Sequence, residues 1–286
     1  MNISSNSTIE YDAAPGINQT IYATPTYGNL ILSNESGTGT SLKTNTGTIT
    51  VTGTTQLQEN TTWTLGAGVV SNGAMSVKNG GTFETNNQVV SGSGSFTTEA
   101  GSTLIITSTQ GISSSGATGN IQTTTRSFST AGNYTYNGSS LTSSGTGLPA
   151  TMNNLTINNS GGVTLSGSGS TYTVSGTLRL TSGPIGLNGK TLSINNLIRS
   201  SGTISSSTTS SLVVNGTSIP LYFSAGARFI KNLTLGNNAS ASLGTTLDMV
   251  GGSTYGTLTI GSGATLTTND RLTLRSTSTG TARIAE

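Results

Sequence analysis

Residues 60–112 read NTTWTLGAGVVSNGAMSVKNGGTFETNNQVVSGSGSFTTEAGSTLIITSTQGI, and their pattern predicts the architecture of the chain. Short apolar or aromatic segments alternate there with polar residues and are separated by Gly, Asn and Ser turns. Equivalent positions recur at a nearly constant step in residue number: Trp63, Phe83 and Leu104 are 20 and 21 apart, Val70, Val90 and Ile112 are 20 and 22 apart, and Met75 and Phe96 are 21 apart. We expect an all-β, parallel β-helix with about 20 residues and three short strands per coil, whose inward side chains stack from coil to coil.

The second half of the chain repeats a strand pattern of Leu, any residue, then Ile, Leu or Val. Alternation with a period of two points both apolar residues inward. The pairs are Leu155/Ile157, Leu178/Leu180, Leu192/Ile194, Leu212/Val214, Leu233/Leu235, Leu258/Ile260 and Leu272/Leu274. The first Leu of each pair follows the previous one by 23, 14, 20, 21, 25 and 14 in residue number; the longer steps fit one coil, and 14 fits two faces of a three-faced coil. Hairpins with two-residue turns would not predict this recurrence.

A longer repeat has the form N-L-x-[IL]-x-N and occurs three times. Its defining residues are Asn29, Leu30 and Leu32, then Asn154, Leu155 and Ile157, then Asn232, Leu233 and Leu235. A second signal precedes each copy, because the residue numbers of Asp12, Asn137 and Asn215 are lower than that of the first Asn by 17 every time. The spacing predicts internal modules at about 8–132, 133–210 and 211–286 within a single elongated solenoid, 1–286.

Composition excludes several classes of chemistry. Gly, Ser, Thr and Asn supply 166 of the 286 residues, and there is no Cys and no His. Zinc fingers, Cys or His nucleophiles, Ser-His-Asp triads and haem or iron–sulfur ligation are therefore excluded. We expect no catalytic, cofactor-binding or metal-ligating residues.

Charge and hydropathy exclude two kinds of partner. The net charge is +2, from 11 basic and 9 acidic residues, and the bases are spread singly along the sequence, so we expect no nucleic-acid partner. No apolar run exceeds three residues, which predicts no membrane span. Residues 1–10 lack the basic and apolar regions of a signal peptide.

Several stretches resemble the repeat regions of large secreted surface proteins of Bacteroidetes. They are QTI (19–21) with YGNLILS (27–33), GATGNIQ (116–122) with NYTYNG (133–138), and GLP (147–149) with NLTINNSGGVTL (154–165). Nearly the whole chain is covered. The resemblance implies a right-handed parallel β-solenoid, an adhesive or structural role, and a secreted or cell-surface location. Members of this family carry a signal peptide and a type IX secretion sorting domain, so we read this chain as an interior fragment or a truncated gene product, with neighbouring repeats or domains as partners.

Two alternatives place a specific activity on the same fold. A carbohydrate-active β-helix enzyme, a polysaccharide lyase or hydrolase, needs clustered acids and bases, whereas Glu84 and Glu99 differ by 15 in residue number and do not superimpose on the coil period. An ice-binding solenoid needs a flat Thr array that repeats from coil to coil. The candidate strand for surface binding is Thr44, Thr46, Thr48, Thr50, Thr52 and Thr54, which alternation would place on one face of an extended strand.

Aromatic side chains could form a sugar-stacking platform, but their phase favours the core. Trp63 shares the phase of Phe83 and Leu104, and Tyr134 and Tyr136 alternate on one strand face. We therefore expect a non-enzymatic stalk, spacer or adhesive array. Its exposed hydroxyls would bind glycans or surfaces weakly and repetitively, and an uncapped end would associate with another copy.

Overall fold

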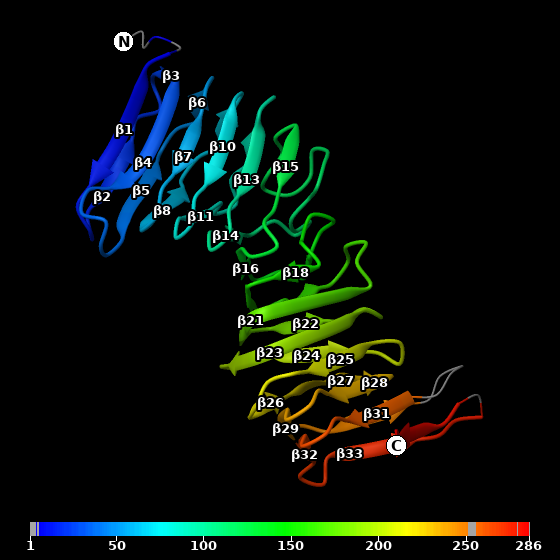
Figure 1. Ribbon diagram of the computed structural model, residues 1–286. Helices are drawn as coiled ribbons and strands as arrows, with labels where there is room; N and C mark the ends of the chain where they lie inside the picture. Colours follow the sequence, from blue (N-terminus) through cyan, green and yellow to red (C-terminus); the bar gives the residue numbers. More distant parts are fainter. Residues whose placement is uncertain (1–3, 5, 251–255, 279, 286) are drawn as a thin grey trace. The chain divides into compact units, whose positions relative to one another are not determined.

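The computed structural model describes residues 4, 6–250, 256–278 and 280–285. These residues contain no helix, and strands make up 54% of the chain. Parallel strands stack in about 13 turns of a β-solenoid with about 21 residues per turn, which confirms the predicted fold class (Figure 1). The chain divides into two compact units, Met1–Asn137 with Ser144–Pro149, and Gly138–Ser143 with Ala150–Glu286. No described segment forms a helix that is long and apolar enough to cross a membrane.

The first unit has three faces, and each face is formed by parallel strands of one sheet. The first sheet contains β1 (Thr8–Ala13), β4 (Asn29–Asn34), β7 (Thr55–Leu57), β10 (Ala74–Val77), β13 (Ser95–Thr98) and β15 (Thr125–Ser127). The second contains β2 (Asn18–Ile21), β5 (Ser41–Asn45), β8 (Thr61–Leu65), β11 (Thr82–Glu84), β14 (Thr103–Ile106) and β16 (Asn133–Gly138). The third contains β3 (Thr26–Tyr27), β6 (Ile49–Val51), β9 (Val69–Ser71) and β12 (Val90–Ser91).

Stacked apolar side chains fill this unit as the sequence predicts. Trp63 pairs with Phe83, Phe83 with Leu104, and Met75 with Phe96. The Trp63 and Phe83 ring centroids are 5.3 Å apart, and those of Phe83 and Phe96, on different faces of the coil, are 5.9 Å apart. The side chains of these columns are fully buried, because successive strand residues alternate between core and solvent.

One predicted column is wrong. Val90 pairs with Val69 rather than Val70, and it forms its next bridge with Ile121 rather than Ile112. The error at Ile112 comes from a longer coil, since Phe96 pairs with Arg126, a step of 30 in residue number where the step from Met75 to Phe96 is 21. The error at Val70 is one of alternation, because Val69 holds the buried position and Val70 points outward. Arg126 holds the extra segment, because its Nε donates to the Thr123 carbonyl at 2.9 Å and its guanidinium also donates to the carbonyls of residues 113 and 116. Burial lowers the pKa of this guanidinium.

The second unit also has three faces. Its first face is formed by strands of the 14-stranded sheet: β19 (Asn154–Asn159), β21 (Thr171–Ser182), β23 (Thr191–Arg199), β25 (Ser211–Val214), β28 (Asn232–Leu235), β31 (Gly256–Ile260) and β34 (Ala282–Ile284), with β18 (Thr151–Met152) on β21. The next contains β17 (Thr142–Ser143), β20 (Val163–Thr164), β22 (Pro184–Gly186), β24 (Thr203–Ser206), β27 (Phe223–Ile230), β30 (Leu247–Val250) and β33 (Leu272–Arg275). The shortest contains β26 (Ile219–Leu221), β29 (Ser240–Leu243) and β32 (Thr265–Thr267).

Most of the Leu steps predicted for this unit are confirmed, but the step of 14 from Leu178 to Leu192 does not cross to another face. Both residues lie on the same sheet, where Leu178 pairs with Leu197 and Leu192 with Tyr172. Leu155 pairs with Leu178, and Leu192, Leu212, Leu233 and Leu258 form one continuous column. The final short step, from Leu258 to Leu272, reaches a different face, because Leu272 pairs with Leu247 on the second sheet. The strands of this unit differ widely in length, and so do the segments that connect them, yet their inward side chains form one core.

Polar side chains also enter the core of the first unit. The indole Nε1 of Trp63 donates to Asn45 Oδ1 at 3.2 Å. Lys43, in register with Trp63, is 1% exposed, and its Nζ donates to Gln19 Oε1 at 2.9 Å. Burial lowers the pKa of Lys43, against the opposing charge of Asp12. The alternation in β5 therefore places Lys43 inside and Leu42 outside, the reverse of their polarity.

Candidate surface-binding site

The predicted Thr strand is not one strand. Thr44 belongs to β5 and Thr50 to β6, while Thr46, Thr48, Thr52 and Thr54 lie in the segments that connect β5, β6 and β7. None of the six is buried, but they follow one coil around its corners. The expectation of one extended face is therefore wrong, because alternation along a sequence keeps side chains on one face only while the strand continues.

The corner after β5 has an identifiable cause. The buried Asn45 carboxamide donates to the Gly47 and Ala67 carbonyls at 2.9 and 3.0 Å. These hydrogen bonds fix the turn at Asn45 and tie it to the next coil. An Asn inside a T-x-T-x series is the sequence feature that ends the strand, since Asn side chains bond readily to nearby backbone groups.

The three motif asparagines have a common structural role. Asn29, Asn154 and Asn232 each begin a strand, and each Oδ1 accepts a backbone N–H from a Thr of the following coil. The distances are 2.8 Å to Thr54 N, 2.7 Å to Thr177 N and 3.2 Å to Thr257 N. Each carboxamide thus satisfies a donor of the next coil at a corner. The motif Leu and Ile side chains beside them are buried.

The constant spacing of 17 follows from the length of a coil. Val214 pairs with Leu235 and Tyr11 with Leu32, and the residue numbers differ by 21 in both pairs. Asn215 lies four positions beyond Ser211, which pairs with Asn232, so the spacing is one coil less those four positions. The two signals of each repeat therefore lie on adjacent coils.

We expect Asn154→Ala to lower the free energy of unfolding by about 1–2 kcal/mol, because it leaves the partly buried Thr177 N–H without its acceptor. Asn154→Asp keeps an acceptor and should recover part of the loss. Urea unfolding followed by circular dichroism measures both. Equal losses in the two variants would contradict the proposed role of the Asn154 oxygen.

A groove of about 380 Å³ lies on the shortest sheet of the second unit. Ser240 pairs with Thr265 and Ser242 with Thr267, so four outward side chains form two columns of hydroxyls. The hydroxyl groove is lined by Ser218, Ser240, Ala241, Ser242, Thr265 and Thr267.

Local geometry explains how the groove is shaped. Ser218 has a positive φ of 58° at the corner before β26, and its N–H donates to Ser240 Oγ at 2.7 Å. The Ser240 proton therefore remains available as a donor. Nothing in the lining ionises at neutral pH, so the groove can offer hydroxyl donors and acceptors to a ligand but no acid–base pair.

Sequence reasoning missed this groove. T-x-T at 265–267 is visible as a pair, but the matching S-x-S at 240–242 lies one long coil earlier, and Thr pairs alone show no common phase. The length of the coil that runs from Ser240 to Thr265 is the signal that could have joined them.

The other candidate side chains do not converge on the groove. Trp63, Tyr134 and Tyr136 are in the core, as predicted, at 0–1% exposure. Burial raises the pKa of Tyr134 to about 12. Glu84 accepts a hydrogen bond from Thr64, and Glu99 pairs with Lys78 at 2.7 Å, so each carboxylate has a surface partner on a neighbouring coil. Within the described ranges, no three His, Cys, Asp or Glu side chains gather as metal ligands would.

No family model, curated protein or solved structure matches the chain. The fold and the exposed chemistry of its faces therefore carry the functional argument.

Proposed function

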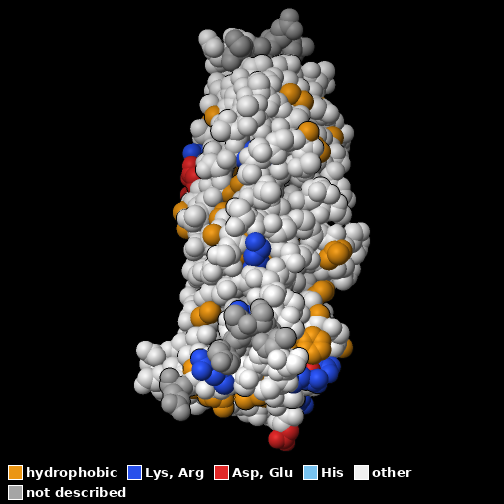
Figure 2. Space-filling view, turned by 90° about the vertical axis from the view of Figure 1, so that its right-hand side faces the viewer, with side chains coloured by type: hydrophobic (Ala, Val, Ile, Leu, Met, Phe, Trp, Pro, Cys, Tyr) orange, Lys and Arg blue, Asp and Glu red, His pale blue; other side chains and the backbone are white. Residues whose placement is uncertain are grey.

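We propose that the chain is a non-enzymatic structural and adhesive segment of a secreted cell-surface protein, a stalk or spacer that binds glycans or surfaces weakly. The supporting observation is the hydroxyl groove. In it, parallel strand register aligns Ser and Thr side chains of neighbouring coils in two columns. Much of the face shown in Figure 2 is likewise neither apolar nor charged. Such a surface suits neutral, hydroxyl-rich ligands.

Weak individual contacts fit an adhesive role because a solenoid can present many of them. Hydroxyl–hydroxyl bonds exchange protein–water for protein–ligand bonds and give little net affinity each. Attachment then depends on several sites acting together, through neighbouring repeats of a longer protein. The secreted location and the relation to Bacteroidetes surface repeats rest on the resemblance of the stretches at 19–33, 116–138 and 147–165.

Binding to a panel of neutral glycans, measured by NMR titration of the whole chain, tests this proposal. We expect millimolar binding whose shifts cluster at the groove, about threefold weaker in a Ser242→Ala/Thr267→Val double variant. Thr259→Val is the matched control, because Thr259 is an outward Thr of β31 outside the groove.

Two outcomes would overturn the proposal. Release of reducing or unsaturated sugar from any bound glycan would identify an enzyme instead. NMR shifts that lie outside the groove would show that the ligand binds elsewhere. Binding by the Thr259→Val control as weak as that of the double variant would show the same. The secreted location is tested separately by the flanking gene sequence, in which we expect a signal peptide and a sorting domain.

A further inference from the structure

Two arginines far apart in sequence meet at one buried carboxylate in the second unit. Arg228 Nε lies 3.2 Å from Asp248 Oδ2, and Arg275 Nε lies 3.4 Å from Asp248 Oδ1. Asp248 is 1% exposed, whereas the two Arg side chains are 36% and 53% exposed. The sequence suggested that the basic residues stand singly, but these two lie together in the fold. We call Arg228 and Arg275 the arginine pair.

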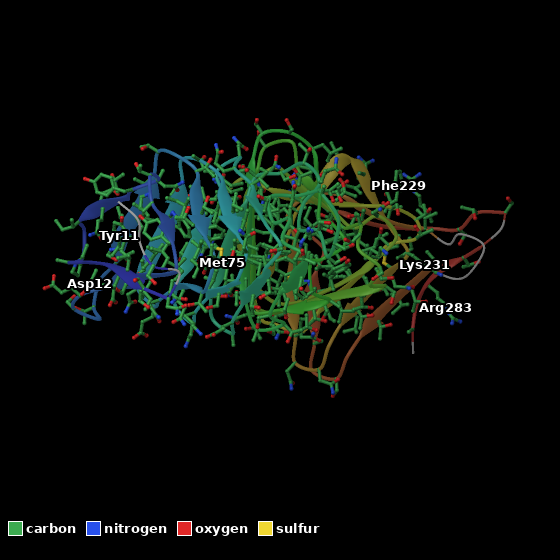
Figure 3. All side chains as sticks on the ribbon, turned by 90° about the horizontal axis from the view of Figure 1, so that it is seen from above. Tyr11, Asp12, Met75, Phe229, Lys231 and Arg283 are labelled. Atoms are coloured by element: carbon green, nitrogen blue, oxygen red, sulfur yellow. The ribbon has the colours of Figure 1, made fainter. Side chains whose placement is uncertain are left out.

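Strand register brings these residues together. Asp248 on β30 pairs with Phe229 on β27 and with Thr273 on β33, so its two arginines come from the coil before and the coil after. Phe229 and Lys231, labelled in Figure 3, follow Arg228 along the chain. Three extra residues before Arg228 bulge outward, and Arg228 Nη1 closes the bulge on the Ala225 carbonyl at 3.2 Å.

The pair has unused donors and an uncompensated charge. Arg228 donates through Nε to Asp248 and through Nη1 to the Ala225 carbonyl, whereas Arg275 forms an ion pair with Asp248, so Arg228 Nη2 and the half-exposed Arg275 guanidinium keep donors for a ligand. One carboxylate neutralises one of two positive charges. A planar guanidinium oriented by a neighbouring carboxylate presents its remaining N–H groups as a fork, which is the arrangement that binds carboxylates or sulfates.

The rest of the unit offers few competing acids. From residue 150 onward the sequence has eight Arg and Lys residues but only Asp248, Asp270 and Glu286 as acids. An anion approaching this unit therefore meets a net positive field, and long-range attraction adds to the local contacts.

From this geometry we propose that the arginine pair is a binding site for the carboxylate or sulfate groups of an acidic polysaccharide. This inference goes beyond the hydroxyl groove and does not depend on it. A polysaccharide fits the observations better than a nucleic acid, because the site offers one pair of guanidiniums rather than a long basic stripe with aromatic residues.

Binding of the whole chain to immobilised polygalacturonate, dextran sulfate and neutral dextran tests the proposal. We expect binding to at least one polyanion that weakens with salt, and about fivefold weaker binding for Arg275→Gln. The matched control is Arg179→Gln, which removes one exposed charge from β21 on a different sheet and should change binding less than about twofold. Polygalacturonate and dextran sulfate distinguish a carboxylate from a sulfate ligand.

Three results would overturn the assignment. Equal losses for Arg275→Gln and Arg179→Gln would show general charge attraction without a site. Absence of binding to both polyanions at low salt would show that the chain does not bind acidic polysaccharides. Tighter binding to single-stranded DNA, with a steeper salt dependence, would replace the polysaccharide with a nucleic acid. Binding of neutral glycans at the hydroxyl groove is unaffected in every case, so the two proposals fail separately.

Discussion

Trp63→Ala should lower the free energy of unfolding by about 3–5 kcal/mol, the largest loss we expect from a single side chain in the first unit. Trp63 is fully buried and in register with Lys43 on one side and Phe83 on the other. Its removal leaves a cavity that backbone pairing above and below prevents from collapsing. It also leaves the buried Asn45 Oδ1 without its indole donor.

Urea unfolding followed by circular dichroism measures this loss, because Trp63 is the only Trp and its fluorescence disappears with it. Thr62→Ala is the matched control, since Thr62 is the outward neighbour on β8, and its effect should stay within about 0.5 kcal/mol. Trp63→Phe should fall between the two. A loss for Trp63→Ala as small as that of Thr62→Ala would place Trp63 outside the core.

Gly73→Ala should cost about 2–3 kcal/mol for a different reason, the close approach of one coil to the next. Gly53, Gly73 and Gly94 occupy the same corner in three successive coils. A Cβ on Gly73 would overlap the Gly53 carbonyl, and a Cβ on Gly94 would overlap the Gly73 carbonyl. The clashing atoms are backbone, so relief requires the coils to separate.

The same unfolding measurement compares Gly73→Ala with Gly226→Ala. A Cβ at Gly226 meets nothing within 4 Å, and this exposed position should tolerate the change within about 0.5 kcal/mol. Similar stability of the two variants would mean that the corner has room for a side chain, and the close stacking of coils would be wrong.

The core was predictable because its signal is periodic. Trp63, Phe83 and Leu104 recur in phase, and backbone pairing keeps that phase wherever the coils have equal length. The prediction failed at Ile112, where Arg126 holds an insertion that changes the period. Ile112 and Ile121 are both buried, so the apolar pattern alone does not show which of them continues the column.

The candidate sites were less predictable because outward positions carry no such constraint. Ser242 and Thr267 become neighbours only when the length of the coil between them is known. The meeting of Arg228 and Arg275 needs two coil lengths and the bulge before Arg228. Lys43 is the opposite case, an inward position that the sequence does not reveal. The alternation of β5 places its side chain in the core, although a charged residue is expected in solvent.

Residues about one coil apart are neighbours in parallel register, and spin labels can measure this proximity because the chain has no native Cys. Thr62 and Thr82 are outward register partners on adjacent coils, whereas Thr62 and Ser76 are closer in sequence but lie on different faces. We expect strong dipolar broadening for labels at Thr62→Cys/Thr82→Cys and weak broadening at Thr62→Cys/Ser76→Cys. The reverse order would contradict the solenoid.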